Sequence, residues 1–345
     1  MAPDLTPYLT VTEGELRAAL DRDEPALLPF YAMLRYPLGF ADEQFQPVQA
    51  DSGKRLRPVF CLLVSELLCG DYARALPGAA AVELLHNFSL VHDDIEDGDE
   101  MRRHRATLWT LAGVPHAINA GDALFALAER ELLRLPERGV AAERVLRAIE
   151  IFQDTCVQLV EGQYLDMQGE QIRAPSLAWY KQMIAGKTAA LLSAATGIGA
   201  AVATDDAHMV TRCREFGIEL GLAYQMTDDI LGLWGDPSVT GKAAGADLRR
   251  KKKSLPVVLA LERDGPLSST IQQAFDQGTV REEDVLAIMR LMDEANVRTA
   301  VEQEVGKHRH RASRALKRII REGAVSTKAG VLLEALTATL TQREK

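Results

Sequence analysis

The sequence has few aromatic residues, few cysteines and no excess of positive charge. Aromatic residues make up only 6 % of its 345 residues, while alanine and leucine are abundant, which favours helices over a β-sandwich. The formal net charge of −9 argues against a general nucleic-acid-binding protein, because such proteins normally carry a basic surface. A site for an anionic substrate is still compatible with this charge, since local basic groups or metals can dominate a site.

The cysteines are scattered and form no C-x-x-C pair. We interpret them as reduced thiols, and the N-terminus lacks the pattern of a signal peptide, so we expect a cytoplasmic protein. The most apolar stretch, residues 188–203, is shorter than the roughly 20 residues that span a bilayer. We therefore expect no transmembrane segment and interpret this stretch as a buried helix.

Long helical patterns with short breaks follow one another along the whole chain, and period-two alternation of β-branched residues is nearly absent. No repeat, low-complexity tract or Pro/Gly/Ser-rich linker separates two domains. We therefore predict one all-α domain over residues 1–345. The helices are expected at 11–22, 25–36, 56–69, 76–97, 115–134, 140–170, 176–202, 206–233, 254–263, 281–293, 296–321 and 326–342.

The segment VELLHNFSLVHDDIEDGDEMRRHR joins a helix to an acidic turn and two arginines. Asp93 and Asp97 are four residues apart, so they lie about 40° from each other on a helix, and Asp94 lies beside Asp93. Carboxylates this close repel one another unless a cation bridges them, and oxygen ligands suit a hard ion such as Mg²⁺. Arg102 and Arg103 follow directly, and guanidinium groups match phosphate oxygens. Taken alone, the acidic residues fit a solvated helix end equally well.

A second pair of adjacent aspartates stands in GLAYQMTDDILGLWGD. Gln225, Asp228 and Asp229 share a helix face, and their apolar neighbours indicate burial. Buried carboxylates need cations or hydrogen-bond donors, although a solvated aspartate pair fits this segment alone equally well. Two such helices in one chain are a stronger signal, because facing each other they could hold metal ions around one diphosphate and stabilise the departing pyrophosphate.

Basic residues around these helices offer further contacts for phosphates. Lys54 and Arg57 lie three residues apart at an expected helix start, which is a favourable place for an anion. Lys242 lies in a loop before the basic run 249–253, which fits a lid over phosphates as well as a solvated surface. His86 lies two turns before the first acidic pair and could donate a hydrogen bond to a second anion, although a core histidine fits equally well.

In their order along the chain, these motifs resemble those of the trans-isoprenyl diphosphate synthases, or polyprenyl synthases. The matching segments are GKRLRP at 53–58, ELLHNFSLVHDDIED at 83–97, RR at 102–103, GQYLD at 162–166, KT at 187–188, YQMTDD at 224–229 and GK…AD…K at 241–252. The resemblance implies an isoprenoid synthase fold, a homodimer, three Mg²⁺ ions, and the condensation of isopentenyl diphosphate with an allylic diphosphate. The departing pyrophosphate would serve as the base for the final proton loss.

The resemblance also implies a role for each matched residue. The metals would be held directly by Asp93, Asp97 and Asp228, with support from Asp94, Asp229 and Asp166. The allylic diphosphate would be held by Arg102, Lys187 and Lys242, with Thr188, Gln225 and Lys252 nearby. Isopentenyl diphosphate would be bound by Lys54, Arg57, His86 and Arg103. The residues that act in catalysis would be Asp93, Asp94, Asp97, Arg102, Lys187, Asp228 and Lys242.

Three places depart from the pattern of this family. Gly232 replaces the last aspartate of the second acidic motif. His104 and Ala106 replace the glycine and proline that usually follow the arginine pair, and Lys251 replaces a glycine near the basic lid.

Product length in this family is related to side-chain bulk beneath the first acidic motif. Phe88, next to Ser89, lies five residues before Asp93, which is about 7.5 Å along a helix, so its ring would floor the substrate pocket. We therefore expect short products from dimethylallyl, geranyl or farnesyl diphosphate, with C20 ahead of C15. The alternative is that Phe88 only packs in the core while Phe125 or Leu85 sets the depth.

Three other functions would leave different features in the sequence. A class I terpene cyclase would carry N-D-x-x-S-x-x-x-E as its second motif and would lack GKRLRP, which is the reverse of this sequence. A non-catalytic subunit of a heteromeric synthase would have lost its acidic motifs, whereas this chain retains both. A longer-chain polyprenyl diphosphate synthase would share every motif and differ only in pocket depth.

Overall fold

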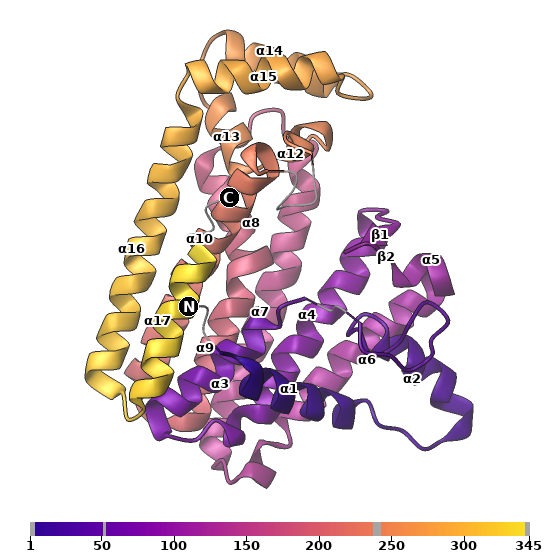
Figure 1. Cartoon of the computed structure of the whole chain (residues 1–345), viewed down its shortest axis with the longest axis vertical. Helices are drawn as coiled ribbons and strands as arrows, with labels where there is room; N and C mark the ends of the chain where they lie inside the picture. The colour runs from indigo at the N-terminus through magenta and orange to yellow at the C-terminus, as the bar shows by residue number, and fades with distance from the viewer. Residues whose placement is uncertain (1–3, 51–52, 237–242, 342–345) are drawn as a thin grey trace. The chain divides into compact units, whose positions relative to one another are not determined.

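A computed structural model of the chain describes residues 4–50, 53–236 and 243–341. The regular secondary structure of these residues is helical, apart from one antiparallel hairpin of β1 (Met101–Arg102) and β2 (Arg105–Ala106) (Figure 1). The predicted all-α class is confirmed. The predicted phosphate ligand Lys242 lies outside the described residues.

The chain divides into two compact units, each built from segments that are far apart in the sequence. Unit 1 comprises Met1–Cys156, Ala194–Cys213 and Ile319–Leu333, and unit 2 comprises Val157–Ser193, Arg214–Arg318 and Glu334–Lys345. Every boundary between the units falls inside a helix. The single domain expected over residues 1–345 stays a prediction.

Unit 1 contains the N-terminal helices and both strands. Its N-terminal helices and short 3₁₀ turns are α1 (Thr6–Ala19), η1 (Pro25–Leu27), α2 (Leu28–Arg35), α3 (Leu56–Cys69), η2 (Ala73–Ala75), α4 (Leu76–Glu96), α5 (Leu108–Ala112), α6 (Val114–Leu132), η3 (Leu135–Arg138) and the first half of α7 (Ala142–Gly169). The unit also contains most of α9 (Ala190–Ala203), the start of α10 (Ala207–Trp234), the end of α16 (Val297–Gly323) and the start of α17 (Thr327–Thr341).

Helix α4 carries the first acidic motif and packs chiefly against α6, α3 and α1. A Cβ atom built on Gly121 of α6 would lie only 2.2 Å from His92 Nε2 of α4, so a larger residue at 121 would have to displace the His92 ring. Helix α3 is buried over all of residues 58–67 and fills the core of the unit. The first acidic motif is therefore held on a helix that is packed on several sides.

Helix α3 has the bounds that the sequence predicts. It begins after Arg55, which is in the left-handed region with φ 43°, and ends at Gly70, where φ is 78°. A glycine in this conformation is a common way to end a helix, because it has no Cβ to clash. The predicted bounds of α3 are therefore confirmed, whereas α1 begins at Thr6 and ends at Ala19, several residues before the predicted range 11–22.

Unit 2 contains most of the C-terminal half of the chain. Its elements are the second half of α7, α8 (Leu177–Ile184), the π-helical segment η4 (Ala185–Ala189), the start of α9 (Ala190–Ala203), most of α10 (Ala207–Trp234), α12 (Ala246–Arg249), α13 (Leu255–Leu261), α14 (Pro266–Asp276), α15 (Glu282–Glu294), most of α16 (Val297–Gly323) and the end of α17 (Thr327–Thr341).

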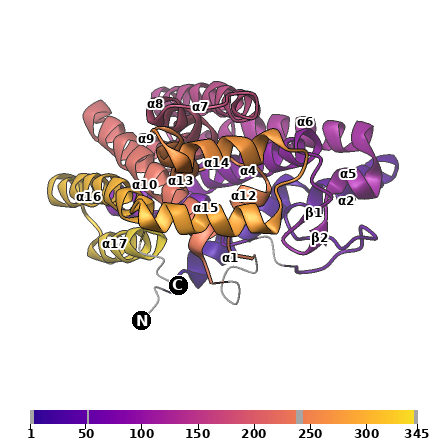
Figure 2. The same cartoon turned by 90° about the horizontal axis from the view of Figure 1, so that it is seen from above.

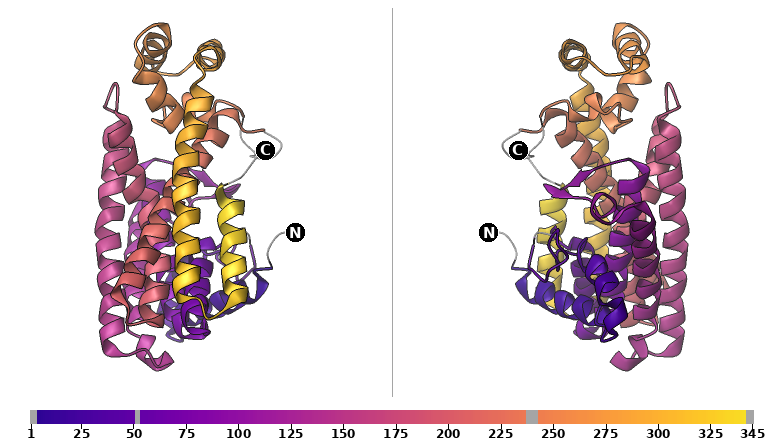
Figure 3. Two further views of the ribbon diagram at one scale, coloured as in Figure 1. Left: turned by 90° about the vertical axis from the view of Figure 1, so that its left-hand side faces the viewer. Right: turned by 90° about the vertical axis from the view of Figure 1, so that its right-hand side faces the viewer.

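Helix α14 pairs with α15, and the two lie side by side in every view (Figures 2 and 3). Helix α14 was not predicted from the sequence, although Pro266 in its first turn and apolar residues at 267, 271 and 274 are helical signals. The short helices α5 and α12 and the β-hairpin were also missed, because elements of two to five residues carry no periodic pattern.

The apolar stretch around α9 forms part of a continuous helical run from Leu177 to Ala203. Among the described residues this is the one helix long and apolar enough to cross a membrane, and 83 % of its apolar window is buried in the structure. The burial agrees with the buried helix expected for residues 188–203. The run also contains η4, whose extra residue per turn coincides with the KT motif. Such π-helical turns are common at functional sites.

Candidate active site

The first acidic motif stands at the C-terminal end of α4. The helix ends at Glu96, and the backbone N–H of Asp97 donates to the carbonyl of Asp93 at 2.8 Å, so these two aspartates lie one turn apart as predicted. Asp97 is exposed and Asp93 is half-buried, whereas Asp94 is only 5 % exposed. The two aspartates expected to hold metal directly are thus the more accessible ones.

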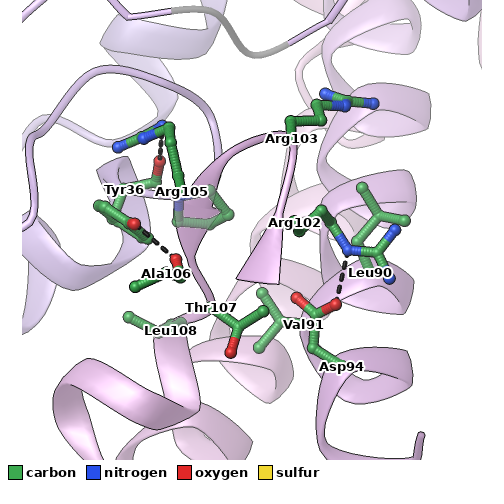
Figure 4. Close-up of a pocket in the computed structure, with 11 residues that line it drawn as sticks. Tyr36, Leu90, Val91, Asp94, Arg102, Arg103, Arg105, Ala106, Thr107 and Leu108 are labelled. Atoms are coloured by element: carbon green, nitrogen blue, oxygen red, sulfur yellow. Dashed lines mark hydrogen bonds and ion pairs between the residues drawn. The ribbon is translucent and has the colours of Figure 1, made fainter. Parts of the chain in front are cut away.

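Asp94 is fixed by the hairpin that follows the helix. Arg102 of β1 donates from Nε to Asp94 Oδ1 at 2.5 Å (Figure 4). Burial raises the pKa of the Asp94 carboxyl, and the charge of Arg102 offsets this shift only in part. Arg102, which we expected at the allylic diphosphate, therefore also holds the end of α4 against the hairpin.

The turn of the hairpin explains one departure from the family pattern. Both central residues, Arg103 (φ 51°) and His104 (φ 61°), are in the left-handed region, as a two-residue type I′ hairpin requires. Lys251 likewise has φ 54°. His104 and Lys251 thus stand where glycine would be favoured, and each retains the turn at a conformational cost of roughly 1–2 kcal/mol.

A small cavity of about 50 Å³ lies beside Asp94, between α4 and the hairpin (Figure 4). One wall is formed by Tyr36, whose hydroxyl donates to the carbonyl of Ala106 at 2.6 Å. Arg105 lies over the Tyr36 ring, with its guanidinium carbon 4.2 Å from the ring centroid. A cavity of this volume has room for about one or two water molecules, not for a prenyl chain.

A cationic group forms elsewhere in unit 1, where the GKRLRP segment meets the arginine pair. A Cβ atom built on Gly53 would lie 2.4 to 2.8 Å from the guanidinium of Arg103, so the absence of a side chain at Gly53 makes room for that group. Burial and the nearby charges of Arg57, Arg103 and Arg102 hold the pKa of His86 well below its ordinary value.

Three cations that disfavour protonation of one histidine create a site that favours an anion. The structure therefore brings together three of the four residues expected at isopentenyl diphosphate, namely Arg57, His86 and Arg103. Lys54 is exposed on the same segment as Arg57. Their roles in binding stay predictions.

Two buried charged residues of this region were not predicted. Arg55 is buried inside GKRLRP, donates to the carbonyl of Leu38 at 2.6 Å and lies over the Phe40 ring. Glu83 is 3 % exposed, and burial raises its pKa while Arg55 and Arg57 act in the opposite direction. In the sequence, only its place as the first residue of the segment ELLHNFSLVHDDIED indicates that Glu83 belongs to the site.

The second acidic motif lies in unit 2, on α10, and its two aspartates point in different directions. Asp228 is exposed, whereas Asp229 is 1 % exposed. The carboxylate of Asp229 accepts four hydrogen bonds, from Tyr180 Oη at 2.6 Å, Gln225 Nε2 at 3.0 Å, Lys252 Nζ at 3.1 Å and the backbone N of Leu255 at 2.9 Å. Asp229 therefore links α10 to α8 and to the start of α13.

Lys252 lies between two carboxylates. Its Nζ atom is 3.1 Å from Asp229 Oδ1 and 4.0 Å from Asp247 Oδ2. Burial alone would lower the pKa of Lys252, but the carboxylates of Asp229, Asp247 and Asp228 raise it, so the ammonium group stays charged. Tyr180 and Asp247 had not been assigned a role from the sequence.

A chain of hydrogen bonds extends from Asp229 to the KT motif. Thr188 Oγ1 donates to Gln225 Oε1 at 2.9 Å, and Gln225 in turn donates to Asp229. Lys187 Nζ donates to Asp166 Oδ2 at 2.6 Å. Gly162 makes the required space, because a Cβ atom on it would lie 2.1 Å from the backbone N of Lys187. The predicted site residues Thr188, Gln225, Asp229 and Lys252 are thus connected in one small network and Lys187 and Asp166 in another, while Asp228 lies exposed beside Asp229.

The donors available for a metal are carboxylate oxygens. Within the described residues, no group of three or more His, Cys, Asp or Glu side chains is gathered closely enough to hold a metal ion on its own. Mg²⁺ usually takes one or two carboxylates and completes its shell with water and substrate phosphates. The outward-facing Asp93, Asp97 and Asp228 fit this mode of binding.

Phe88 lies on α4 at the head of a row of aromatic rings. Its centroid is 5.3 Å from that of Phe125 on α6, and Phe125 is 6.3 Å from Phe152 on α7. The hydroxyl of Ser89 donates to the carbonyl of His86 and is thus used within the helix. Phe88 and Phe125, the two aromatic candidates for the floor of the pocket, are therefore in contact with their rings tilted against each other.

Comparison with known proteins gives one consistent result. The sequence model of the polyprenyl synthetase family matches residues 41–292. A (2E,6E)-farnesyl diphosphate synthase of Mycobacterium tuberculosis is 37 % identical over 297 residues, covering 85 % of this chain and 80 % of its own. A geranylgeranyl diphosphate synthase of the same organism is 44 % identical over 233 residues, covering 68 % of this chain and 65 % of its own.

The crystal structure of a polyprenyl synthetase from Streptomyces coelicolor A3(2) superposes with a TM-score of 0.87 at 36 % identity, covering 97 % of each chain. The match of the family model over most of the sequence, the similarity to curated synthases and the shared fold agree with the motifs and their geometry. The chain belongs to the polyprenyl synthetase family.

Proposed function

We propose that this protein is a Mg²⁺-dependent short-chain trans-prenyltransferase. It condenses isopentenyl diphosphate with dimethylallyl, geranyl or farnesyl diphosphate to C15–C20 products, with geranylgeranyl diphosphate favoured. One observation carries the proposal: each Asp-Asp pair has one accessible aspartate and one aspartate held by a cation. The names of the relatives from Mycobacterium tuberculosis support the same substrate class.

The residues divide the chemistry among them. Asp93, Asp97 and Asp228 would hold three Mg²⁺ ions, which when bound supply positive charge to the diphosphate leaving group. The neighbouring Asp94 and Asp229 each accept a hydrogen bond from a cationic side chain, and these bonds hold the helices that carry the metal ligands in place.

Cationic side chains bind the two diphosphates. Lys187, positioned by Asp166, offers an ammonium group to the allylic diphosphate. Arg57, Arg103 and His86 bind the diphosphate of isopentenyl diphosphate, and the neutral imidazole can still donate one hydrogen bond. No side chain is required as a general base.

The reaction begins when the allylic C–O bond breaks and pyrophosphate leaves with the electron pair. The double bond of isopentenyl diphosphate then forms the new C–C bond with the allylic cation. The proton lost from the adduct goes to the pyrophosphate, which balances the charges. The side chains listed above act by position and charge, which is the usual basis of catalysis at diphosphates.

Pyrophosphate release by the purified chain tests this function. Release should require both isopentenyl diphosphate and an allylic primer, should stop on addition of EDTA, and should return with excess Mg²⁺. Release from the allylic diphosphate alone would indicate a cyclase instead. Absence of release under all conditions would indicate a non-catalytic subunit.

Replacing Phe88 with alanine should lengthen the main product by at least one isoprene unit. The change removes the first ring of the Phe88–Phe125–Phe152 row and leaves Phe125 as the next barrier. Chromatography of the dephosphorylated products measures the result. Phe30→Ala, which removes a half-buried ring that makes an edge-to-face contact with Tyr31, should leave the products unchanged. An unaltered product profile with normal turnover in Phe88→Ala would move the floor to Phe125 or Leu85.

We also propose that the protein is a homodimer. Helix α7 carries an exposed apolar stripe at i, i+3, i+7 and i+10 spacing, formed by Val157, Val160, Tyr164 and Met167. A contiguous apolar stripe of this kind is a typical protein-interaction surface.

Val160→Arg should therefore convert the dimer to a monomer in light scattering coupled to size-exclusion chromatography. The control is Leu286→Arg on α15, which introduces the same charge at an equally exposed leucine and should leave the mass unchanged. A Val160→Arg variant that keeps the wild-type mass would reject the stripe as the interface.

A cytoplasmic location is proposed as well. It is supported by the four cysteines, none of which forms a disulfide and three of which are buried. Fractionation of the producing cells, with a cytoplasmic and a secreted marker enzyme as references, measures it directly.

A further inference from the structure

Gly232 stands where the second acidic motif of the family usually has its last aspartate. It lies four residues after Asp228 on α10. Residues at this spacing occupy the same face of a helix, with Cβ atoms roughly 5–6 Å apart. A carboxylate at position 232 would therefore extend the metal-binding face that begins with Asp228.

The space above Gly232 is filled by another carboxylate. A Cβ atom built on Gly232 would lie 2.6 Å from Oδ2, 2.7 Å from Cγ and 2.8 Å from Oδ1 of Asp247. No side chain fits at position 232 while Asp247 keeps this place. The carboxylate that is missing from α10 is thus replaced, in nearly the same place, by one from α12.

Asp247 is held in this place by its surroundings in unit 2. The backbone N of Gly245 donates to the carbonyl of Leu233 at 2.9 Å, which ties the start of α12 to α10 directly beside Gly232. The backbone N of Lys252 donates to the carbonyl of Asp247 at 2.9 Å, and the Lys252 ammonium lies 4.0 Å from its Oδ2. The Asp247 side chain is 13 % exposed although its Oδ2 atom is buried, so a small ion or its water can reach only the exposed part of the side chain.

We propose that Asp247 supplies the carboxylate that the second acidic motif lacks, so that Asp228 and Asp247 together form its metal site. This inference rests on the proposed function. Two carboxylates from different elements, completed by water and diphosphate, match the coordination that Mg²⁺ prefers. Gly232 is then a positioning residue, because its missing side chain admits Asp247.

The rival explanation is that Asp247 only balances the charge of Lys252. Asp229 already lies closer to that ammonium, at 3.1 Å against 4.0 Å. The two explanations differ in metal affinity, because a pure charge partner of Lys252 would leave the binding of metal nearly unchanged when it is replaced.

Binding of Mn²⁺ in the presence of inorganic pyrophosphate, followed by electron paramagnetic resonance, separates them. Asp247→Asn should raise the Mn²⁺ concentration that half-fills the weakest site by about tenfold or more. Gly232→Ala should do the same, because its methyl group displaces the Asp247 carboxylate. Asp264→Asn, at an exposed aspartate, and Gly306→Ala, at a helical glycine with open space around it, are the matched controls and should bind like wild type.

Exchanging the two side chains gives an independent test. Gly232→Asp alone should weaken Mn²⁺ binding, since two carboxylates then compete for one place, whereas Gly232→Asp combined with Asp247→Ala should restore it to within a few-fold. Wild-type affinity in folded Asp247→Asn and Gly232→Ala, or no recovery in the exchanged variant, would overturn the inference. If the wild-type chain formed no prenyl product while Mn²⁺ binding still depended on Asp247, the proposed function alone would fail.

Discussion

Replacing Asp229 with alanine should lower the free energy of unfolding by about 3 to 5 kcal/mol. The change removes a 1 % exposed carboxylate and leaves the donors on Tyr180, Lys252 and Leu255 without their acceptor. Unsatisfied buried donors are costly because they have given up their hydrogen bonds to water. Urea denaturation in metal-free buffer measures the loss, as a lower midpoint at an unchanged slope.

The control for this experiment is Asp264→Ala, at an exposed aspartate of the same unit. It should change the free energy of unfolding by less than about 0.5 kcal/mol. A wild-type midpoint for Asp229→Ala would show that the four hydrogen bonds do not hold α8, α10 and α13 together.

Replacing the neighbouring Asp228 with asparagine should have the opposite effect: it should lower kcat and leave the free energy of unfolding nearly unchanged. Asp228 is exposed and is the predicted metal ligand of the second motif. Its replacement should lower kcat by about 10²- to 10³-fold, because charge on the leaving pyrophosphate is stabilised less well. The free energy of unfolding should stay within about 0.5 kcal/mol of wild type, since no buried group loses a partner.

Steady-state kinetics at saturating Mg²⁺, together with the same urea titration, measure both quantities for this variant. A large loss of stability with near-normal kcat in Asp228→Asn would mean that the two aspartates have exchanged roles. Asp228 and Asp229 therefore serve as controls for each other. They are adjacent on one helix, but Asp228 is exposed and Asp229 is buried.

The features that the sequence predicts well are local ones. The bounds of α3, the one-turn spacing of Asp93 and Asp97, and the buried apolar stretch in α9 all follow from residue spacing and composition. The family resemblance then supplied the roles of the matched residues. At two positions where the family usually has glycine, this chain has His104 and Lys251. Both residues keep the left-handed backbone conformation that glycine favours.

The features that the sequence could not predict depend on contacts between distant segments. Nothing in the Asp-Asp pairs themselves shows that the second aspartate of each is buried, because Arg102 and Lys252 reach them from 8 and 23 residues away. The contribution of Asp247 is hidden for the same reason. At position 232 the sequence shows only a missing aspartate, and the carboxylate above it comes from another helix.

We expect this chain to join isopentenyl diphosphate to an allylic diphosphate. The most direct measurement incubates the purified protein with radiolabelled isopentenyl diphosphate, farnesyl diphosphate and Mg²⁺, and identifies the dephosphorylated products by gas chromatography. We predict that the label appears in geranylgeraniol, and in no prenyl alcohol when either substrate or Mg²⁺ is withheld. Label that stays entirely in isopentenyl diphosphate, with a folded protein and each allylic primer in turn, would contradict the claim.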